Sequence, residues 1–98
     1  MKKNLFFIVE SNNMHEYKKE KHTIDYTAKD EDDRNLLHIA IISDADKIAQ
    51  DLIYNGIDIN ATDRYGLTPL HLCAEYENYS VAEILLRKGA VVDPVDKY

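Results

Sequence analysis

The side chains best suited to chemistry in this sequence are its histidines and its cysteine, and their spacing does not favour a catalytic or metal site. His15 and His22 lack the i, i+4 pairing that a helical zinc site uses. Cys73 is the sole cysteine, so a disulfide within the chain is excluded, and its place among apolar residues indicates packing. The sequence contains no P-loop, GxGxxG, GxSxG, HExxH or CxxC motif. We therefore expect a protein that is not an enzyme, with no catalytic residue, no metal ligand and no cofactor.

The other two histidines, His38 and His71, occupy the same place in two successive copies of an internal repeat. The matched residues, at a fixed offset of 33, are Asp30 and Asp63, Leu37-His38 and Leu70-His71, Leu52-Ile53 and Leu85-Leu86, and Gly56 and Gly89. The repeat holds the two imidazoles apart instead of bringing them to one metal ion. Each is expected to hydrogen-bond the backbone of a neighbouring loop.

Each copy predicts two short helices. Thr68 can cap a helix that starts at Pro69, since proline has no amide hydrogen and suits the first helical position. A second apolar run at helical spacing, from Val81 to Leu86, ends before Gly89, a natural residue to follow a helix. The first copy predicts helices over about 36–42 and 47–55. Its core candidates are Ile39, Ala40, Ile48, Ala49, Leu52 and Ile53.

A 33-residue period, a turn, two helices and a TPLHxA-like core together resemble the ankyrin repeat. The second copy matches the family pattern at Asp63, Gly66, Thr68 to His71, Ala74, Leu85, Leu86, Gly89 and Ala90. In the first copy, Asp33 replaces the turn glycine and Leu36 replaces the proline. Aspartate tolerates positive φ better than most residues, and Asn35 can still cap the helix. The resemblance implies an all-α solenoid of stacked helix-turn-helix units joined by β-hairpin-like loops.

The residues before the first copy are interpreted as a degenerate capping unit of the same solenoid. An apolar run from Leu5 to Val9 is too short for a signal peptide, because Glu10 interrupts it. The same offset of 33 places Leu5 with His38 and Ile8 with Ile41, and predicts helices over about 3–10 and 13–21. Phe6, Phe7 and Val9 are expected to supply bulk to this unit, while Met14 and Tyr17 face its neighbour.

The whole chain is accordingly predicted to be one domain. It divides into a capping unit over 1–29, repeats over 30–62 and 63–95, and the start of a truncated further repeat over 96–98. The last helix and the small and apolar residues Leu72, Cys73 and Ala74 are expected to leave an apolar C-terminal surface, which a further unit or self-association would cover.

The charge balance narrows the class of partner. The 98 residues carry 12 Lys and Arg against 18 Asp and Glu, a net charge of −6. Such a chain repels phosphate, so nucleic acid is not expected as a ligand. The sequence has no apolar run long enough to span a membrane, and the lone cysteine fits a reducing compartment, so a cytoplasmic location without membrane contact is expected.

The resemblance implies a scaffold that binds another protein through its hairpin tips and concave face, with the acidic residues steering a basic partner. The residues expected to contact the partner are Glu31, Asp32, Arg34, Ile42 and Ser43 in the first repeat and Arg64, Tyr65, Leu67, Glu75 and Tyr76 in the second. An alternative is a stoichiometric inhibitor, such as an immunity or antitoxin-like protein, that neutralises a basic enzyme.

Overall fold

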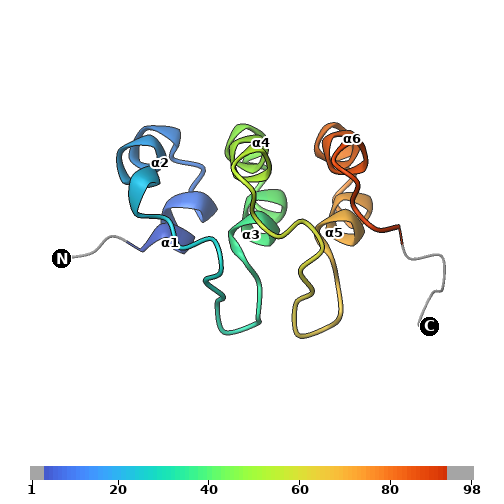
Figure 1. Ribbon diagram of the computed structural model, residues 1–98. Coiled ribbons are helices and arrows are strands. Elements are labelled where there is room, and N and C mark those ends of the chain that lie inside the picture. Colours follow the sequence, from blue (N-terminus) through green and yellow to red (C-terminus); the bar gives the residue numbers. More distant parts are fainter. Residues whose placement is uncertain (1–3, 93–98) are drawn as a thin grey trace.

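The computed structural model describes residues 4–92, which form two layers of short helices (Figure 1). One layer contains α1, α3 and α5, and the other contains α2, α4 and α6, so that the chain stacks as three helix pairs. No strand occurs within the described residues, and the all-α solenoid is confirmed. The elements are α1 (Leu5–Glu10), α2 (Met14–Glu20), a 3-10 turn (Lys21–Thr23), α3 (Leu36–Ile42), α4 (Asp46–Tyr54), α5 (Pro69–Glu75) and α6 (Tyr79–Arg87).

Side-chain caps determine where most of these helices begin. The Thr68 hydroxyl accepts a hydrogen bond from the His71 amide, and Pro69 is the first helical residue, as predicted. Asn35 caps α3 in the same way, accepting from the His38 amide at 3.0 Å. In both helices the histidine ring returns a bond to the amide of the capping residue, which completes a reciprocal capping box.

The turn of the first hairpin keeps its geometry without glycine. Asp33 has φ 61°, while Gly66 at the equivalent place has φ 80°. The tolerance predicted for aspartate at this position is therefore confirmed, as is the capping role of Asn35.

The turns inside the helix pairs correct the register of the first unit. Asn12, Asp44 and Glu77 all have positive φ, and the next amide in each case bonds back to the preceding helix. The acceptors are the carbonyls of Ile8, Ala40 and Cys73, at 3.1, 2.8 and 2.8 Å. Ile8 therefore occupies the place of Ala40, an offset of 32, and the predicted pairing of Ile8 with Ile41 is wrong by one residue, as is that of Leu5 with His38.

The first unit is one residue shorter than the repeats because its second helix ends in a tighter turn. The helix α2 runs directly into the 3-10 turn over Lys21–Thr23, whereas α4 ends before Gly56, which has φ 91°. A 3-10 turn closes with fewer residues per turn than an α-helix, so the first unit is shorter by one residue before its loop. A comparison at one fixed offset could not reveal this change.

The core runs continuously through the three helix pairs. All six core candidates of the first repeat are buried, as predicted. Two expectations fail: Phe7 is 65% exposed, and Leu72 and Cys73 are buried instead of contributing to the C-terminal surface. Leu72 and Cys73 lie on the side of α5 that packs within the solenoid, and the small Cys73 side chain allows close helix packing there.

A polar contact ties the first unit to the second. The buried Tyr17 hydroxyl donates to Asp51 Oδ2 at 2.7 Å, and Lys21 Nζ lies 2.9 Å from Asp51 Oδ1. Burial acts to raise the pKa of Asp51, but the bonds from Tyr17 and Lys21 outweigh it and hold this pKa below its usual value. Burial and the Asp51 carboxylate raise the pKa of Tyr17, so the phenol stays neutral.

Candidate functional site

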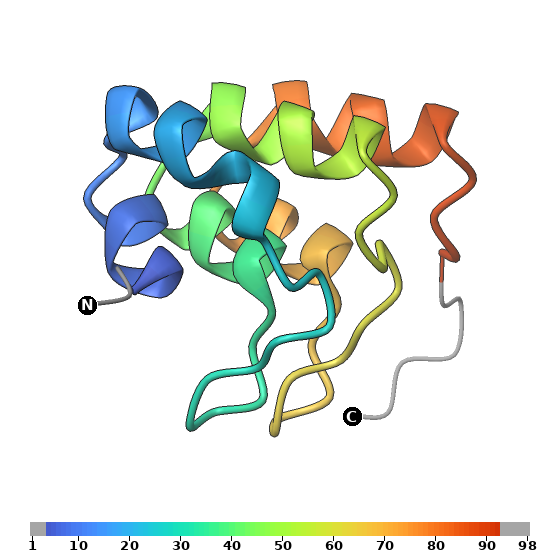
Figure 2. The same ribbon diagram turned by 60° about the vertical axis from the view of Figure 1, so that its left-hand side comes forward.

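Two hairpin loops, which lead into α3 and α5, project below the layer of α1, α3 and α5 and lie side by side (Figure 2). Each is closed by an aspartate at its base, and the same bonds recur in both. Asp30 Oδ1 accepts from the amides of Asp32 and Arg34, at 2.8 and 2.9 Å. Asp63 Oδ1 accepts from the amides of Tyr65 and Leu67, also at 2.8 and 2.9 Å. The loops therefore present their tip residues on a fixed backbone.

Ionic contacts join the two hairpins. The Arg64 amide donates to the Asp32 carbonyl at 2.9 Å, and Arg64 Nη1 lies 3.2 Å from Asp32 Oδ1. Arg34 pairs with Asp30 and Asp32, at 2.9 and 3.3 Å. The bond to Asp32 raises the pKa of the exposed Arg64 guanidinium. Both arginines are thus held by carboxylates of the protein itself.

The hydrogen bonds also determine the charge of the aspartate at the base. Burial acts to raise the pKa of Asp30, but the bonds from the Arg34 backbone and side chain outweigh it, so this pKa is lowered. Asp30 remains ionised at neutral pH. Within residues 4–92, no cation forms a salt bridge with Glu31 or Asp33, which are both exposed. The net charge that the first hairpin offers to solvent is negative.

The structure divides the expected contact residues into two sets. The hairpin-tip residues are Glu31, Asp32, Arg34, Arg64, Tyr65 and Leu67, and the helix-end residues are Ile42, Ser43, Glu75 and Tyr76. The helix-end residues lie at the carboxyl ends of α3 and α5, opposite the ends that the hairpins enter. A seven-residue helix is about 10 Å long, so the two sets lie about one helix length apart and do not contact each other.

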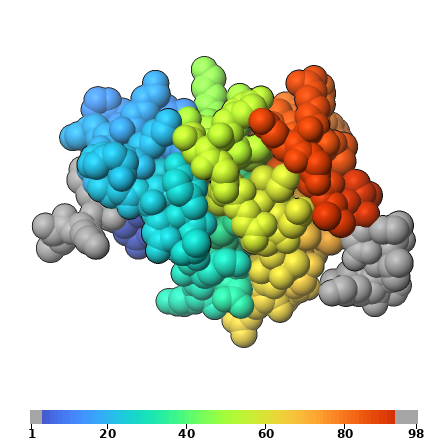
Figure 3. All heavy atoms as spheres, viewed as in Figure 1, coloured from blue at the N-terminus to red at the C-terminus, as the bar shows by residue number. Residues whose placement is uncertain are grey.

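The exposed aromatic side chains stand out within these sets. Tyr65 is 66% exposed, with the Arg64 guanidinium 5.7 Å from its ring centre, and Tyr76 is 49% exposed. Glu31, Arg64 and Glu75 are also exposed, while Asp32, Arg34, Ile42, Ser43 and Leu67 are half-buried. Figure 3 shows the hairpins as neighbouring projections, turquoise and yellow, at the lower edge of the molecule.

The corrected register adds two residues that the sequence comparison missed. At an offset of 32, Glu10 stands at the place of Ile42 and Ser11 at the place of Ser43, and both are exposed. The signal in the sequence was Asn12, a residue type that tolerates positive φ and that matches Asp44 and Glu77 in the turns of the other two units. The helix-end surface therefore extends over the first unit.

The two equivalent histidines have different surroundings. His38 is buried, and its Nε2 lies 3.0 Å from the Leu67 carbonyl of the next hairpin, the loop-backbone contact that was predicted. Burial lowers the pKa of His38 more than the Leu67 carbonyl raises it, so the ring is neutral at pH 7. His71 makes the capping-box bonds with Thr68, but its side chain is exposed.

The remaining reactive groups are dispersed. Among residues 4–92, no three His, Cys, Asp or Glu side chains gather as they would around a metal ion. Burial raises the pKa of the Cys73 thiol to about 11, so it is protonated at neutral pH. No helix in the described part of the chain is both long and apolar enough to cross a membrane.

Stacked helix pairs with projecting hairpins define a helical repeat protein, in which each unit contacts only its neighbours. The profile of the family described as ankyrin repeats (3 copies) matches residues 5–96. The chain belongs to the ankyrin-repeat family. Repeats of this family mediate protein–protein interaction.

Similar proteins include several that are many times longer than this chain. NF-kappa-B inhibitor zeta of Homo sapiens is 36% identical over 63 residues, 64% of this chain and 9% of that protein. The ADP-ribosylation factor GTPase-activating protein AGD2 of Arabidopsis thaliana is 43% identical over 56 residues, 57% of this chain and 7% of that protein. Inversin of Danio rerio is 46% identical over 54 residues, 55% of this chain and 5% of that protein. The matches thus cover less than a tenth of each of these relatives.

Proposed function

We propose that this chain is a non-catalytic module that binds a basic protein partner through the hairpin-tip and helix-end residues. The observation that carries the proposal is the presence of an exposed aromatic side chain in each of the two sets, Tyr65 at 66% exposed and Tyr76 at 49%. Exposed aromatic residues supply much contact area at little entropic cost and are frequent binding hot spots. Glu31 and Asp33, which are exposed and form no salt bridge within residues 4–92, favour a partner with a basic surface.

The experiment starts with capture of the partner from an extract by immobilised protein, followed by affinity measurements with purified components. Tyr65→Ala and Tyr76→Ala should each weaken binding by more than about 1 kcal/mol, as truncation of a buried interface anchor does. Tyr79→Ala is the matched control, since Tyr79 is as exposed as Tyr65 but belongs to neither set. If Tyr79→Ala weakens binding as much as the other two, the proposed face is wrong.

Charge reversal tests the basic character of the partner. Changing Glu31 and Asp32 to lysine should slow association and flatten its dependence on salt, because charges at the rim of an interface act mainly on the encounter rate. An association rate that stays the same at low salt would show that the partner is not steered by charge.

A second candidate is a stoichiometric inhibitor of a basic enzyme. The supporting observation is that one group of similar proteins carries the name inhibitor, NF-kappa-B inhibitor zeta. An inhibitor would form a 1:1 complex and block the activity of the captured partner, whereas an interaction module would leave that activity intact. Titration of the partner's activity with this chain separates the two candidates.

The C-terminal end of the solenoid is proposed as a second contact surface, used in self-association or covered by a further unit. Several side chains of the first repeat are buried, but the equivalent side chains of the second repeat are exposed. His38 and Ile41 are buried, while His71 and Ala74 at the equivalent places are exposed, and Leu86 is 50% exposed where Ile53 is buried. Sedimentation equilibrium tests self-association, and a monomer at high micromolar concentration would exclude it.

We also propose a cytoplasmic location, which imaging of the tagged chain in cells would test.

A further inference from the structure

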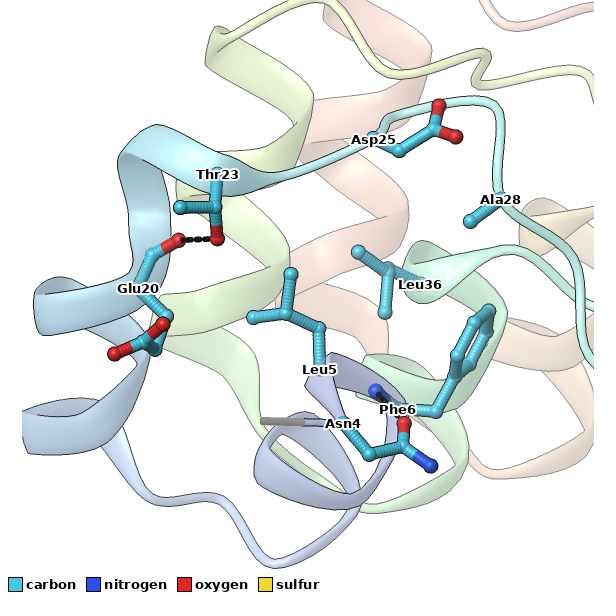
Figure 4. Close-up of a pocket in the computed structure, with 8 residues that line it drawn as sticks. All are labelled: Asn4, Leu5, Phe6, Glu20, Thr23, Asp25, Ala28 and Leu36. Atoms are coloured by element: carbon cyan, nitrogen blue, oxygen red, sulfur yellow. Dashed lines mark hydrogen bonds between the residues drawn. The ribbon is translucent and has the colours of Figure 1, made fainter. Parts of the chain in front are cut away.

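A cavity of about 320 Å³ opens at the first unit, away from the hairpin tips (Figure 4). Leu5 and Phe6 of α1 and Leu36 of α3 point from one side toward the loop that carries Thr23, Asp25 and Ala28. The floor is therefore apolar. The carboxylates of Glu20 and Asp25 stand on opposite sides of the opening, at its rim.

The cavity exists because a glutamate replaces a core leucine. The residues that precede α2, α4 and α6 are Asn13, Ala45 and Asn78. Counting from these residues places Glu20 of the first unit with Leu52 and Leu85 of the next two. Both leucines have no exposed surface, whereas Glu20 is half-buried. An ionised carboxylate is costly to bury without a partner, so Glu20 stays at the edge and leaves the apolar floor open.

The two rim carboxylates have no cationic partner within residues 4–92. The Thr23 hydroxyl donates to the backbone carbonyl of Glu20 at 2.7 Å, not to its carboxylate. Asp25 Oδ1 accepts from the amide and hydroxyl of Thr27, at 2.9 and 2.6 Å, which leaves Oδ2 available. The side-chain bond from Thr27 lowers the pKa of Asp25, so this group is ionised at neutral pH. An apolar floor with two anionic edges results.

We propose that this cavity binds the side chain of an arginine or lysine carried by the protein partner. Long basic side chains pack their methylene groups on apolar surface while the charged end remains at a polar edge. Here the methylene groups would lie on the half-buried Leu5 and Phe6, and the charged end would reach Glu20 or Asp25 at the rim. The inference rests on the proposed function only in that a protein supplies the side chain. The cavity would add a second, chemically defined contact to the hairpin-tip surface.

The test uses small probes and needs no partner. N-acetyl-arginine methylamide and its lysine analogue are titrated into the isotopically labelled chain while amide resonances are followed. Saturable shifts are expected at Leu5, Thr23 and Ala28, with a dissociation constant in the millimolar range. The neutral citrulline analogue, which matches arginine in shape, should produce at least tenfold weaker binding.

Matched variants decide whether the cavity is responsible. The double variant Glu20→Gln with Asp25→Asn should weaken arginine binding at least tenfold, while Glu83→Gln with Asp58→Asn, the same change of charge at exposed positions outside both surfaces, should leave it unchanged. Glu20→Leu should abolish binding by filling the cavity and should raise the melting temperature, which shows that the variant folds.

Three results would overturn the inference. They are shifts spread over all acidic surfaces, an equal response to citrulline, and binding that emerges only after Lys2→Gln with Lys3→Gln, which would assign the cavity to the chain's own lysines. Because no partner is present, a negative result here leaves binding at the hairpin tips standing. Failure of Tyr65→Ala and Tyr76→Ala to weaken partner binding would conversely leave a positive cavity result standing.

Discussion

The contact of Tyr17 with Asp51 predicts how firmly the first unit is held to the rest of the solenoid. Tyr17→Phe removes only the hydroxyl that donates to Asp51 Oδ2 at 2.7 Å. A hydrogen bond to a charged group contributes about 1.5–3 kcal/mol. Asp51 keeps its bond to Lys21 in the variant, so its carboxylate is not left unpaired, and we expect a loss at the lower end, about 1.5–2 kcal/mol.

Urea unfolding followed by circular dichroism measures this loss at pH 7. In a domain of this size a loss of 1 kcal/mol lowers the melting temperature by roughly 4–8 °C, so a fall of roughly 10 °C is expected. Tyr79→Phe is the control, because Tyr79 is exposed and should change stability by less than about 0.5 kcal/mol. In an Asp51→Ala background, Tyr17→Phe should cost nothing. An equal cost in both backgrounds would refute the role given to this hydrogen bond.

The same contact should depend on pH in one direction. The pKa of Asp51 is lowered in the folded protein, so its stabilisation is complete above the ordinary value of 3.8 and is lost as pH falls through the lower folded pKa. The difference between the native protein and Tyr17→Phe should therefore persist at pH 5 and disappear in strong acid.

Three further predictions follow from single residues. The pKa of His38 is lowered in the folded protein, so the unfolded chain binds a proton more readily, and stability should be complete above about pH 6.5 and fall below it. The free energy of unfolding in urea should therefore fall less between pH 7.5 and pH 5.5 for His38→Gln than for the native protein. Cys73, with a buried thiol and a pKa of about 11, should react with a thiol reagent in native buffer far more slowly than in urea, and equal rates would place the thiol at the surface. Asp33→Gly should be tolerated, while Asp33→Val should cost about 1–2 kcal/mol because a β-branched residue is strained at positive φ, and equal melting temperatures would contradict this reasoning.

Much of the fold could be predicted because the local signals and the repeat agree. Thr68 and Pro69 mark a helix start by chemistry that needs no tertiary information, and Asn35 supplies the same signal in the first repeat. The apolar positions of the first repeat are buried because both neighbours exist to cover them. Agreement between caps, turns and periodicity left few alternatives.

The first unit was harder to predict because it is one residue shorter than the two repeats and also differs from them in residue type. The 3-10 turn after α2 removes one residue, so a fixed offset assigned Ile8 to the wrong place and concealed Glu10 as a surface residue. The exposure of Phe7 was not predicted, because an apolar residue type does not by itself indicate which face of α1 its side chain occupies. The cavity beside Glu20 also depends on this register, because only the corrected alignment places Glu20 with two core leucines.

The measurement that tests the central proposal most directly is amide hydrogen exchange of the chain alone and in complex with its captured partner. Binding through the proposed face should slow exchange at the tips of both hairpins, around 31–34 and 64–67, and at the carboxyl ends of α3 and α5. Little change is expected along α4 and α6 in the other layer. Protection confined to α4 and α6, with the hairpins exchanging as in the free protein, would contradict the proposal.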